Sequence, residues 1–231
     1  MKSIYYRASF QINEKYKDIS KVMNRRKISV SSDVFKTSFF LKENKFPENT
    51  KVFFCNHHYA HALSAFFYTD WDNALIYTAD AGGDNVQYSM HVFKDDELQC
   101  LYGGDEWLLQ PRSIDSLGLA YSYATEALGF IPIRHEGKLT GLAAYGEPTI
   151  YDEIAGHFSV SDSGRINSDF QDYKAMKNEI FRLANGTPRE NVATSIQKVL
   201  EDFIYLSVNR VIEQSKVEYL ALAAGCLQMY V

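Results

Sequence analysis

The sequence predicts an α/β protein, because short apolar runs typical of strands alternate with longer runs typical of helices. Strands are expected at residues 51–55, 73–80, 86–93, 98–102 and 218–225. Helices are expected at residues 56–67, 117–128 and 187–214, with surface helices and loops at 149–186. Hydrophobic residues make up 46% of the 231 residues, which fits a folded globular chain.

The composition narrows the classes of function and location. The formal net charge of -5 gives no electrostatic reason to expect nucleic-acid binding. Cys55, Cys100 and Cys226 are far apart, odd in number and set among apolar residues, which is typical of reduced, buried thiols in the cytoplasm. The N-terminus has no apolar signal-peptide core, and no apolar run approaches the roughly 20 residues of a membrane span. We therefore expect a cytoplasmic protein without nucleic-acid or membrane partners.

Residues 1–50 are expected to form a polar, helical lead-in to a second unit at residues 51–231. The lead-in contains a basic cluster between Lys21 and Lys27. A solvated helix with connecting loops is the simpler interpretation of that cluster.

Three of the six histidines, His57, His58 and His61, lie within five consecutive positions at the start of the helix expected at 56–67. His57 and His61 are spaced i, i+4, so they share one face of that helix and can hold two cis positions of one divalent ion. His58 points roughly a third of a turn away. The spacing alone leaves the alternatives open, because helical histidine pairs also occur as hydrogen-bonded core residues or exposed polar side chains.

The strand expected at 73–80 ends in a carboxylate, Asp80, and residues 81–85 (AGGDN) are expected to break it. Gly82 and Gly83 would let backbone amides approach an anion without obstruction by a Cβ atom, as in a phosphate nest. Asp80 could bind a metal or orient a nucleophile. An ordinary tight turn is the structural alternative. Residues 95–97 are expected to form the next turn of the hairpin.

Residues 113–116 can cap the helix at 117–128, and Gly129 is a plausible stop signal. Residues 134–148 combine charges with the small residues Gly141, Ala143 and Ala144. That composition suits either a tightly packed short helix between residues 137 and 146 or a close approach to a ligand.

Thr187 and Glu190 have the spacing of a capping box, with Pro188 at the first helical position. The helix that follows carries one apolar stripe, and its polar Asn191, Gln197 and Asp202 are expected to face water.

Several segments, taken together, resemble the O-carbamoyltransferase family of nodulation-factor and antibiotic-tailoring enzymes. The resemblance rests on residues 56–66 (NHHYAHALSAF), 80–83 (DAGG), 116–122 (SLGLAYS), 136–148 (EGKLTGLAAYGEP) and 189–197 (RENVATSIQ). It extends more distantly to the subunit that installs threonylcarbamoyl on tRNA and to hydrogenase-maturation carbamoyltransferases. The fold that this implies is an incomplete actin-like, Hsp70-like (ribonuclease H-like) nucleotide-binding fold, with a mixed sheet flanked by helices.

The resemblance also implies site residues. His57, His61 and Asp80 match the family's metal ligands, where Fe(II) is the first candidate and Zn or Mn also suit the donor set. Asp80 and His58 are the candidate catalytic residues, with His58 lining the acceptor pocket. The implied cofactor-binding residues are Gly82, Gly83, Asp84 and Lys138. The implied reaction uses carbamoyl phosphate and ATP to form a carbamoyl-adenylate, and then transfers the carbamoyl group to a hydroxyl of a sugar or a related acceptor.

The chain also departs from the family's pattern. It has no Gly-Ile-Ser-like opening strand with a His-Asp pair, and its likeness to the family ends near Ala224. We therefore expect a fragment that lacks a C-terminal half or partner subunit and is inactive alone. A half-domain that acts as a binding partner of another subunit is the alternative. A small metallohydrolase built on His57, His61 and Asp80 is less well supported, because no HExxH-type base accompanies them.

Overall fold

A computed structural model of the chain describes residues 38, 41–42, 44–51, 56–107, 110 and 113–223. Most of the lead-in expected at 1–50 and nearly all of the strand expected at 51–55 lie outside the described residues. The division of the chain at residue 50 therefore stays a prediction.

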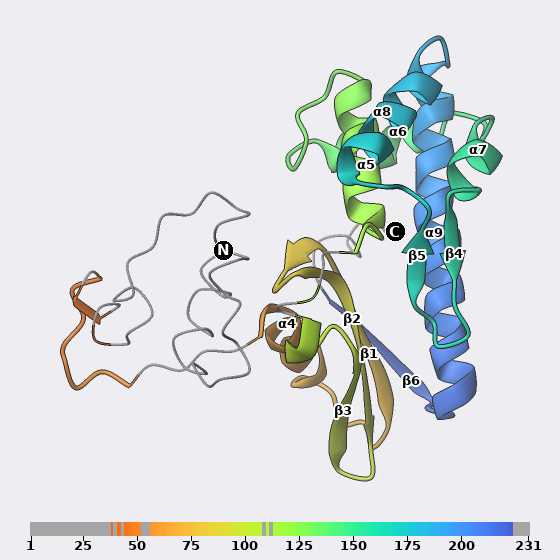
Figure 1. Ribbon diagram of the computed structural model, residues 1–231. Helices are drawn as coiled ribbons and strands as arrows, with labels where there is room; N and C mark the ends of the chain where they lie inside the picture. The colour runs from red at the N-terminus through yellow and green to blue at the C-terminus, as the bar shows by residue number, and fades with distance from the viewer. Residues whose placement is uncertain are drawn as a thin grey trace.

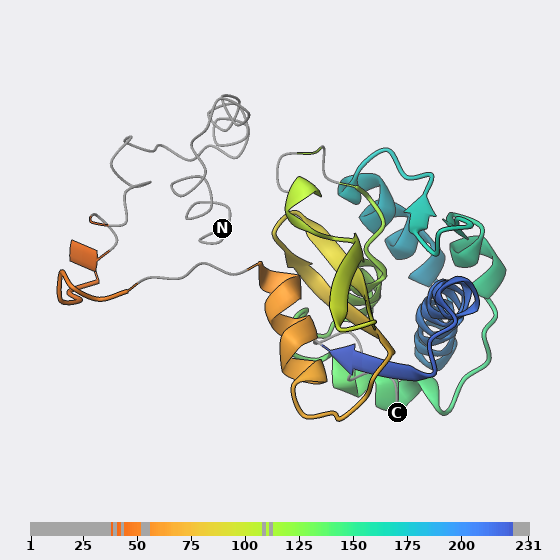
Figure 2. The same cartoon turned by 90° about the horizontal axis from the view of Figure 1, so that it is seen from below.

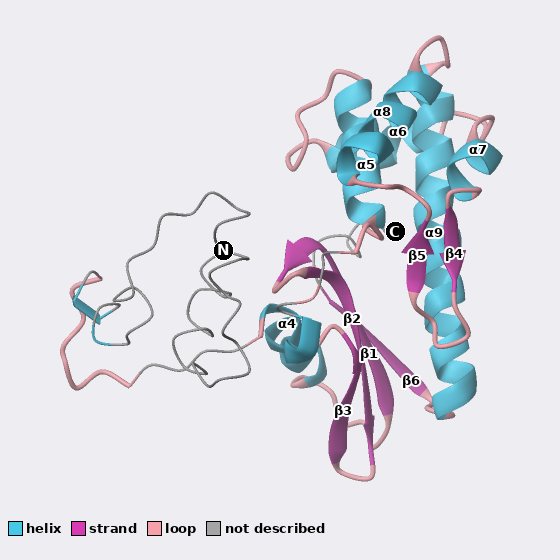
Figure 3. Ribbon diagram, viewed as in Figure 1, coloured by secondary structure: helices cyan, strands magenta, loops and turns pink. Residues whose placement is uncertain are grey.

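The described strands form a four-stranded mixed sheet and a two-stranded sheet (Figures 1 and 3). The larger sheet has the order β3-β2-β1-β6, with β1, β2 and β3 antiparallel and β6 parallel to β1. Its strands are β1 (Ala74–Gly83), β2 (Val86–Lys94), β3 (Glu97–Tyr102) and β6 (Tyr219–Ala223). The smaller sheet pairs β4 (Phe158–Val160) with β5 (Ile166–Ser168).

The helices lie on both faces of the larger sheet, which confirms the α/β class with a mixed sheet flanked by helices. They are α4 (His57–Phe66), α5 (Leu117–Ala127), α6 (Glu136–Ala143), α7 (Tyr151–Ala155), α8 (Tyr173–Ala184) and α9 (Arg189–Ser215), with a 3-10 turn at Asp105–Trp107. Helix α4 covers one face, whereas α5 and α9 lie on the other (Figure 2). None of the described helices is long and apolar enough to cross a bilayer.

The alternation of side chains along β1 divides the core into two parts. Leu75, Tyr77 and Ala79 belong to the large cluster on the α5 and α9 side, whereas Ala74 and Ile76 belong to a small cluster beneath α4. Side chains on both faces of β1 are therefore buried, and this explains why its sequence is a continuous apolar run.

The turns of the hairpins differ from those expected. Strand β1 continues through Gly83, with an irregular register between Ala79 and Gly83, so the glycines do not end it. The turn is formed by Asp84 and Asn85, whose φ angles of 47° and 73° match the pair of positive φ angles of a tight hairpin turn. The next turn uses Asp95 and Asp96 in the same way, and Glu97 already belongs to β3. Cys100 of β3 is exposed, which corrects the expectation of a buried thiol there, and Cys55 and Cys226 lie outside the described residues.

Helix α5 is confirmed with its predicted ends. The Ser116 hydroxyl accepts a hydrogen bond from the Leu119 N–H at 3.0 Å, and Gly129 follows the helix with φ +76°. The short helix expected between residues 137 and 146 is α6. The polar stretch at 159–169 contains the β4–β5 hairpin, which was not predicted because three-residue strands are too short to show periodicity.

Helix α9 begins near the expected position, but the predicted capping box is wrong. Pro188 is the N-cap residue, no side chain caps the helix, and the Thr187 hydroxyl donates to the Leu183 carbonyl of α8 instead. The helix ends before Lys216, which has a left-handed φ of 55°.

The polar side chains of α9 do not simply face water, contrary to expectation. Asn191 accepts a hydrogen bond from the Glu147 N–H, Gln197 accepts one from the Tyr121 hydroxyl, and Asp202 accepts one from the Tyr151 hydroxyl. They tie α9 to three neighbouring segments.

Candidate metal centre

The N-terminus of α4 is held by two side-chain caps. The Asn56 carboxamide oxygen accepts from the Tyr59 N–H at 2.9 Å, and Asp84 Oδ2 accepts from the His57 N–H at 2.7 Å. Asp84 is 3% exposed, and a carboxylate at this position also complements the helix dipole. Because Asp84 belongs to the β1–β2 turn, this contact fixes the helix that carries the histidines to the strand that carries Asp80.

Three potential ligands converge at this junction. One ligand atom from each of His57, His61 and Asp80 lies within 4.8 Å of the others. Asp80 Oδ2 is 3.1 Å from His57 Nε2 and 3.6 Å from His61 Nε2. The side chains of both histidines are 36% exposed and that of Asp80 is 29% exposed, so the cluster is open to small solutes.

These distances fit a shared ion. With metal–ligand bonds of about 2.0–2.2 Å, neighbouring ligand atoms of a six- or four-coordinate ion are about 2.8–3.6 Å apart. Two imidazole nitrogens and one carboxylate oxygen suit a divalent transition metal and leave coordination positions for a substrate. Among the described residues, this is the group of histidines, cysteines and carboxylates with the spacing of a metal site.

Gly83 makes room for the His57 ring. A Cβ atom at residue 83 would lie 2.1 Å from His57 Cδ2 and 2.3 Å from its Cγ, far inside van der Waals contact. Gly82 has φ 148°, which also favours glycine. The close contact of Gly83 is therefore with His57, a candidate metal ligand. The cofactor-binding roles expected for Gly82, Gly83 and Asp84 stay predictions.

The pKa values of the adjacent His57 and His58 are shifted in opposite directions. The hydrogen bond with Asp80 raises the pKa of His57 above its ordinary value of 6.5, against the effect of partial burial. Burial lowers the pKa of His58 to about 4. Near neutral pH, His58 is therefore an uncharged ring.

His58 lies in the core, and its expected catalytic role along an acceptor pocket stays a prediction. Its side chain is fully buried, Nε2 is 3.2 Å from the Val86 carbonyl, and Nδ1 is 2.6 Å from the Thr78 hydroxyl. A carbonyl oxygen can only accept, so Nε2 carries the proton and Nδ1 accepts from Thr78. With both nitrogens engaged, His58 positions α4 on the sheet.

The same reasoning orients a buried chain of hydrogen bonds beneath α4. Thr78 donates to His58 and so accepts from the Ser89 hydroxyl at 2.8 Å. Ser89 in turn accepts from His91 Nδ1 at 3.3 Å. Burial lowers the pKa of His91 to about 4 as well, which keeps this ring neutral.

Asp115 is a carboxylate near the centre that sequence reasoning missed. It is 2% exposed, accepts a hydrogen bond from the Tyr102 hydroxyl, and has a pKa raised by burial. Asp80 and Asp115 line one cavity of about 20 Å³ at the N-terminus of α5. In the sequence, the position of Asp115 just before the Ser116 cap indicates the start of a helix. No local pattern in the sequence indicates that Asp115 lies near Asp80.

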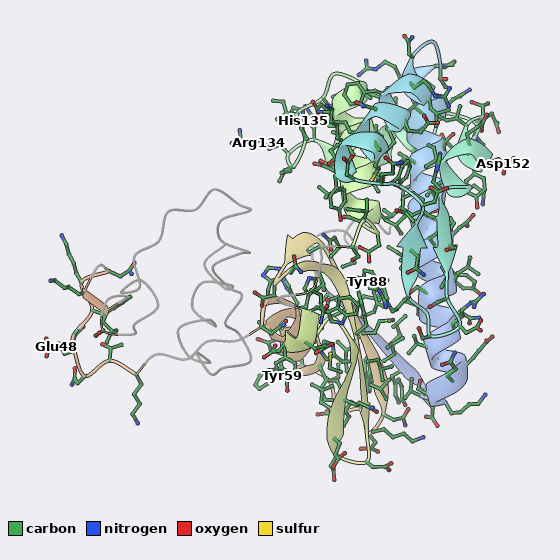
Figure 4. The ribbon with its side chains drawn as sticks, viewed as in Figure 1. Glu48, Tyr59, Tyr88, Arg134, His135 and Asp152 are labelled. Carbon is green, nitrogen blue, oxygen red and sulfur yellow. The ribbon has the colours of Figure 1, made fainter. Side chains whose placement is uncertain are left out.

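Lys138 is not brought to the cluster. It is exposed on α6, and its Nζ is 3.3 Å from His135 Nε2. Figure 4 shows His135 in the helical part of the molecule, whereas Tyr59 of α4 lies beside the larger sheet. The expected cofactor role of Lys138 therefore stays a prediction, separate from the histidine cluster.

Residues 6–229 match the family described as "Carbamoyltransferase N-terminus". An uncharacterized protein of Methanocaldococcus jannaschii is 31% identical over 185 residues, which cover 73% of this chain and 30% of that protein. The nodulation protein NolNO of Sinorhizobium fredii is 30% identical over 184 residues, covering 76% of this chain and 26% of that protein. The nodulation protein NolO of Bradyrhizobium diazoefficiens is 30% identical over 177 residues, covering 74% and 31%.

The chain thus spans less than a third of the length of each of these relatives. The family match covers nearly all of it and includes every residue of the histidine and aspartate cluster. This chain belongs to the family of carbamoyltransferase N-terminal domains.

Proposed function

We propose that the chain carries the metal-binding part of a carbamoyltransferase that passes a carbamoyl group to a hydroxyl of a sugar or a related acceptor. The observation that carries the proposal is the convergence of His57, His61 and Asp80 in a chain of this family. An actin-like nucleotide-binding architecture, with carbamoyl phosphate and ATP as co-substrates, belongs to the same proposal.

The chain's own residues have separate tasks in this proposal. His57 and His61 present Nε2 atoms to a divalent ion, Fe(II) first and Zn or Mn as alternatives, and Asp80 supplies a carboxylate oxygen. When bound, such an ion polarises a carbonyl and holds phosphate oxygens. Asp84 and His58 hold α4 so that both histidines keep their direction.

The metal content of the purified chain tests this proposal directly. We expect one equivalent of divalent metal per chain, lost in the His57→Ala and His61→Ala variants. The matched control is His157→Ala, because His157 also pairs with a carboxylate, Asp169, at 2.7 Å but lies outside the cluster. Metal retained by both cluster variants would refute the site.

A carbamoyl-transfer assay distinguishes a part of a carbamoyltransferase from a half-domain that only binds another subunit. With carbamoyl phosphate, ATP and a sugar acceptor, we expect the metal-loaded chain to bind ATP without turnover, because it spans less than a third of each curated relative. Turnover that His57→Ala abolishes would show a complete catalytic unit. If the chain binds metal but does not bind ATP, the result would favour a half-domain that acts only as a binding partner of another subunit.

A further inference from the structure

A groove of about 540 Å³ opens on the face of the larger sheet that α9 partly covers. Met90 and Val92 of β2 and Leu101 of β3 contribute its apolar floor, and Val211 and Gln214 of α9 stand opposite. Leu101 is 43% exposed. The volume lies within the range of about 300–1,000 Å³ typical of small-molecule sites.

Arg165 lines this groove, next to the start of β5, and is held against two aromatic rings. The centre of its guanidinium group is 4.8 Å from the Tyr102 ring centroid and 4.6 Å from that of Trp107. Cation–π contacts of this kind fix the direction of the group without neutralising its charge.

The Arg165 guanidinium still lacks an acceptor. Its Nε is buried and has no hydrogen-bond partner, and no carboxylate of the described residues pairs with it. Burial raises the pKa of Asp115 and the charge of Arg165 partly opposes this, but Asp115 Oδ2 accepts from the Tyr102 hydroxyl and no ion pair joins this carboxyl to Arg165. A buried donor without an acceptor is costly, and a guanidinium matches the paired oxygens of carboxylate or phosphate.

The other end of the groove has a different character. It is lined by Lys94, Asp95 and Glu97 at the β2–β3 turn, about 17 Å from Tyr102 at roughly 3.4 Å per residue of β3. The Lys94 ammonium lies 3.5 Å from the Ser215 carbonyl, to which it donates. The two carboxylates there disfavour a second anion and favour hydroxyl or amino donors.

We propose that this groove binds a small organic anion, with one carboxylate or phosphate group at Arg165 and its hydroxyl-bearing part along the floor formed by β2 and β3. The site is separate from the metal centre, because Met90 and Val92 face the α9 side of the sheet whereas α4 lies on the other. The inference therefore does not rest on the proposed function.

Trp107 reports on the site, because it touches Arg165 and is one of only two tryptophans in the sequence. In a Trp71→Phe background, its fluorescence is titrated with glucose 6-phosphate and with gluconate, and with glucose as the uncharged comparison. We expect a saturable change with at least one of the two anions and none with glucose. Which anion binds more tightly distinguishes a phosphate from a carboxylate ligand.

In the same background, Arg165→Met is expected to weaken binding by about tenfold to a hundredfold, the range for losing a hydrogen bond to a charged group. Arg210→Met is the matched control, because Arg210 pairs with Asp162 at 2.9 Å outside the groove. His57→Ala should also leave binding unchanged. If Arg165→Met unfolds, Arg165→Lys replaces it in the test. Lysine keeps the positive charge but lacks the planar guanidinium, so anion binding should again be weaker than with Arg165. No saturable response to either anion, or equal weakening by Arg210→Met, would overturn the proposal.

Discussion

The smallest determinant of the candidate centre is the missing side chain of Gly83. The His57 ring occupies the space where a Cβ atom would lie, so the glycine and the histidine are fitted to one another. A turn or a phosphate nest would explain the glycine equally well from sequence, because neither the ring nor its direction is visible there. Residue 83 therefore decides where a candidate ligand points.

We predict that Gly83→Ala lowers metal affinity by about tenfold to a hundredfold, as for other changes that reorient a ligand. The cost in stability should be about 1–3 kcal/mol, typical of overpacking. Calorimetric titration with Zn(II) and urea unfolding measure both. Gly141→Ala is the control, because a Cβ there meets nothing within 4 Å and alanine favours the interior of α6. Equal metal affinity in the two variants would argue against the fit.

Buried neutral histidines make stability depend on pH. The folded pKa values of His58 and His91 are about 4, against 6.5 for the free group, so the unfolded chain binds more protons between these values. The free energy of unfolding must then fall as the pH falls from 6.5 toward 4, by up to about 3 kcal/mol for each histidine. His57, whose pKa is raised, contributes in the opposite sense: its stabilisation is complete below 6.5 and is lost at higher pH.

Urea unfolding of the metal-free chain at several pH values tests this dependence. The His91→Gln variant should lose about half of the acid slope, because one of two titrating groups is removed. An unchanged slope in His91→Gln would show that the loss of stability in acid has another source.

At the scale of elements, the N-terminus of α4 connects the helix that carries His57 and His61 to the hairpin that carries Asp80. The β1–β2 turn places Asp84 under the N-terminus of α4, and Asn85 of the same turn donates to the Trp107 and Gln110 carbonyls. Asn56, the N-cap of α4, donates to Asp105 of the adjoining 3-10 turn. Because these segments share contacts, the position of α4 relative to Asp80 follows from the hairpin.

We predict that Asp84→Ala costs about 1–2 kcal/mol of stability, as for other lost caps, and also lowers metal affinity. Asp172→Ala is the matched control. Asp172 caps α8 by accepting from the Ala175 N–H at 2.7 Å, the same distance as for Asp84. Both variants should lose similar stability in urea, but metal affinity should fall only for Asp84→Ala. A parallel loss of affinity in both would mean that Asp84 acts through global stability alone.

At the scale of the whole molecule, the sheet is assembled from distant parts of the chain. Strand β6 lies parallel to β1, and the Glu218 N–H donates to the Asn73 side chain across 145 residues. The intervening helices form one core with the sheet. Tyr121 of α5 and Gln197 of α9 join two of these helices through a buried hydrogen bond at 2.8 Å.

A double-mutant cycle measures that connection. Gln197→Leu and Tyr121→Phe should each cost about 0.5–1.5 kcal/mol, because each removes this buried hydrogen bond while the remaining group keeps another partner, Thr140 for Tyr121 and Glu201 for Gln197. The double variant should cost less than the sum of the two. Urea unfolding provides the four free energies, and strictly additive costs would show that the bond contributes nothing of its own.

The sequence by itself determined most elements and the candidate ligands. Periodicity, caps and glycines are local signals, so they located α4, β1, β2, α5 and α9, and the i, i+4 spacing paired His57 with His61. The end of the strand made Asp80 a candidate ligand, the family resemblance joined it to the histidine pair, and the cluster brings these three residues together.

Only the tertiary structure decided the rest, because contacts between residues far apart in the chain leave no local pattern. It placed His58 in the core, Lys138 away from the cluster, Asp84 under α4, and Asp115 beside Asp80. It also decided that Arg165 stands against Tyr102 and Trp107 in a groove. Burial and direction of a side chain follow from how the elements pack, and packing is a property of the whole fold.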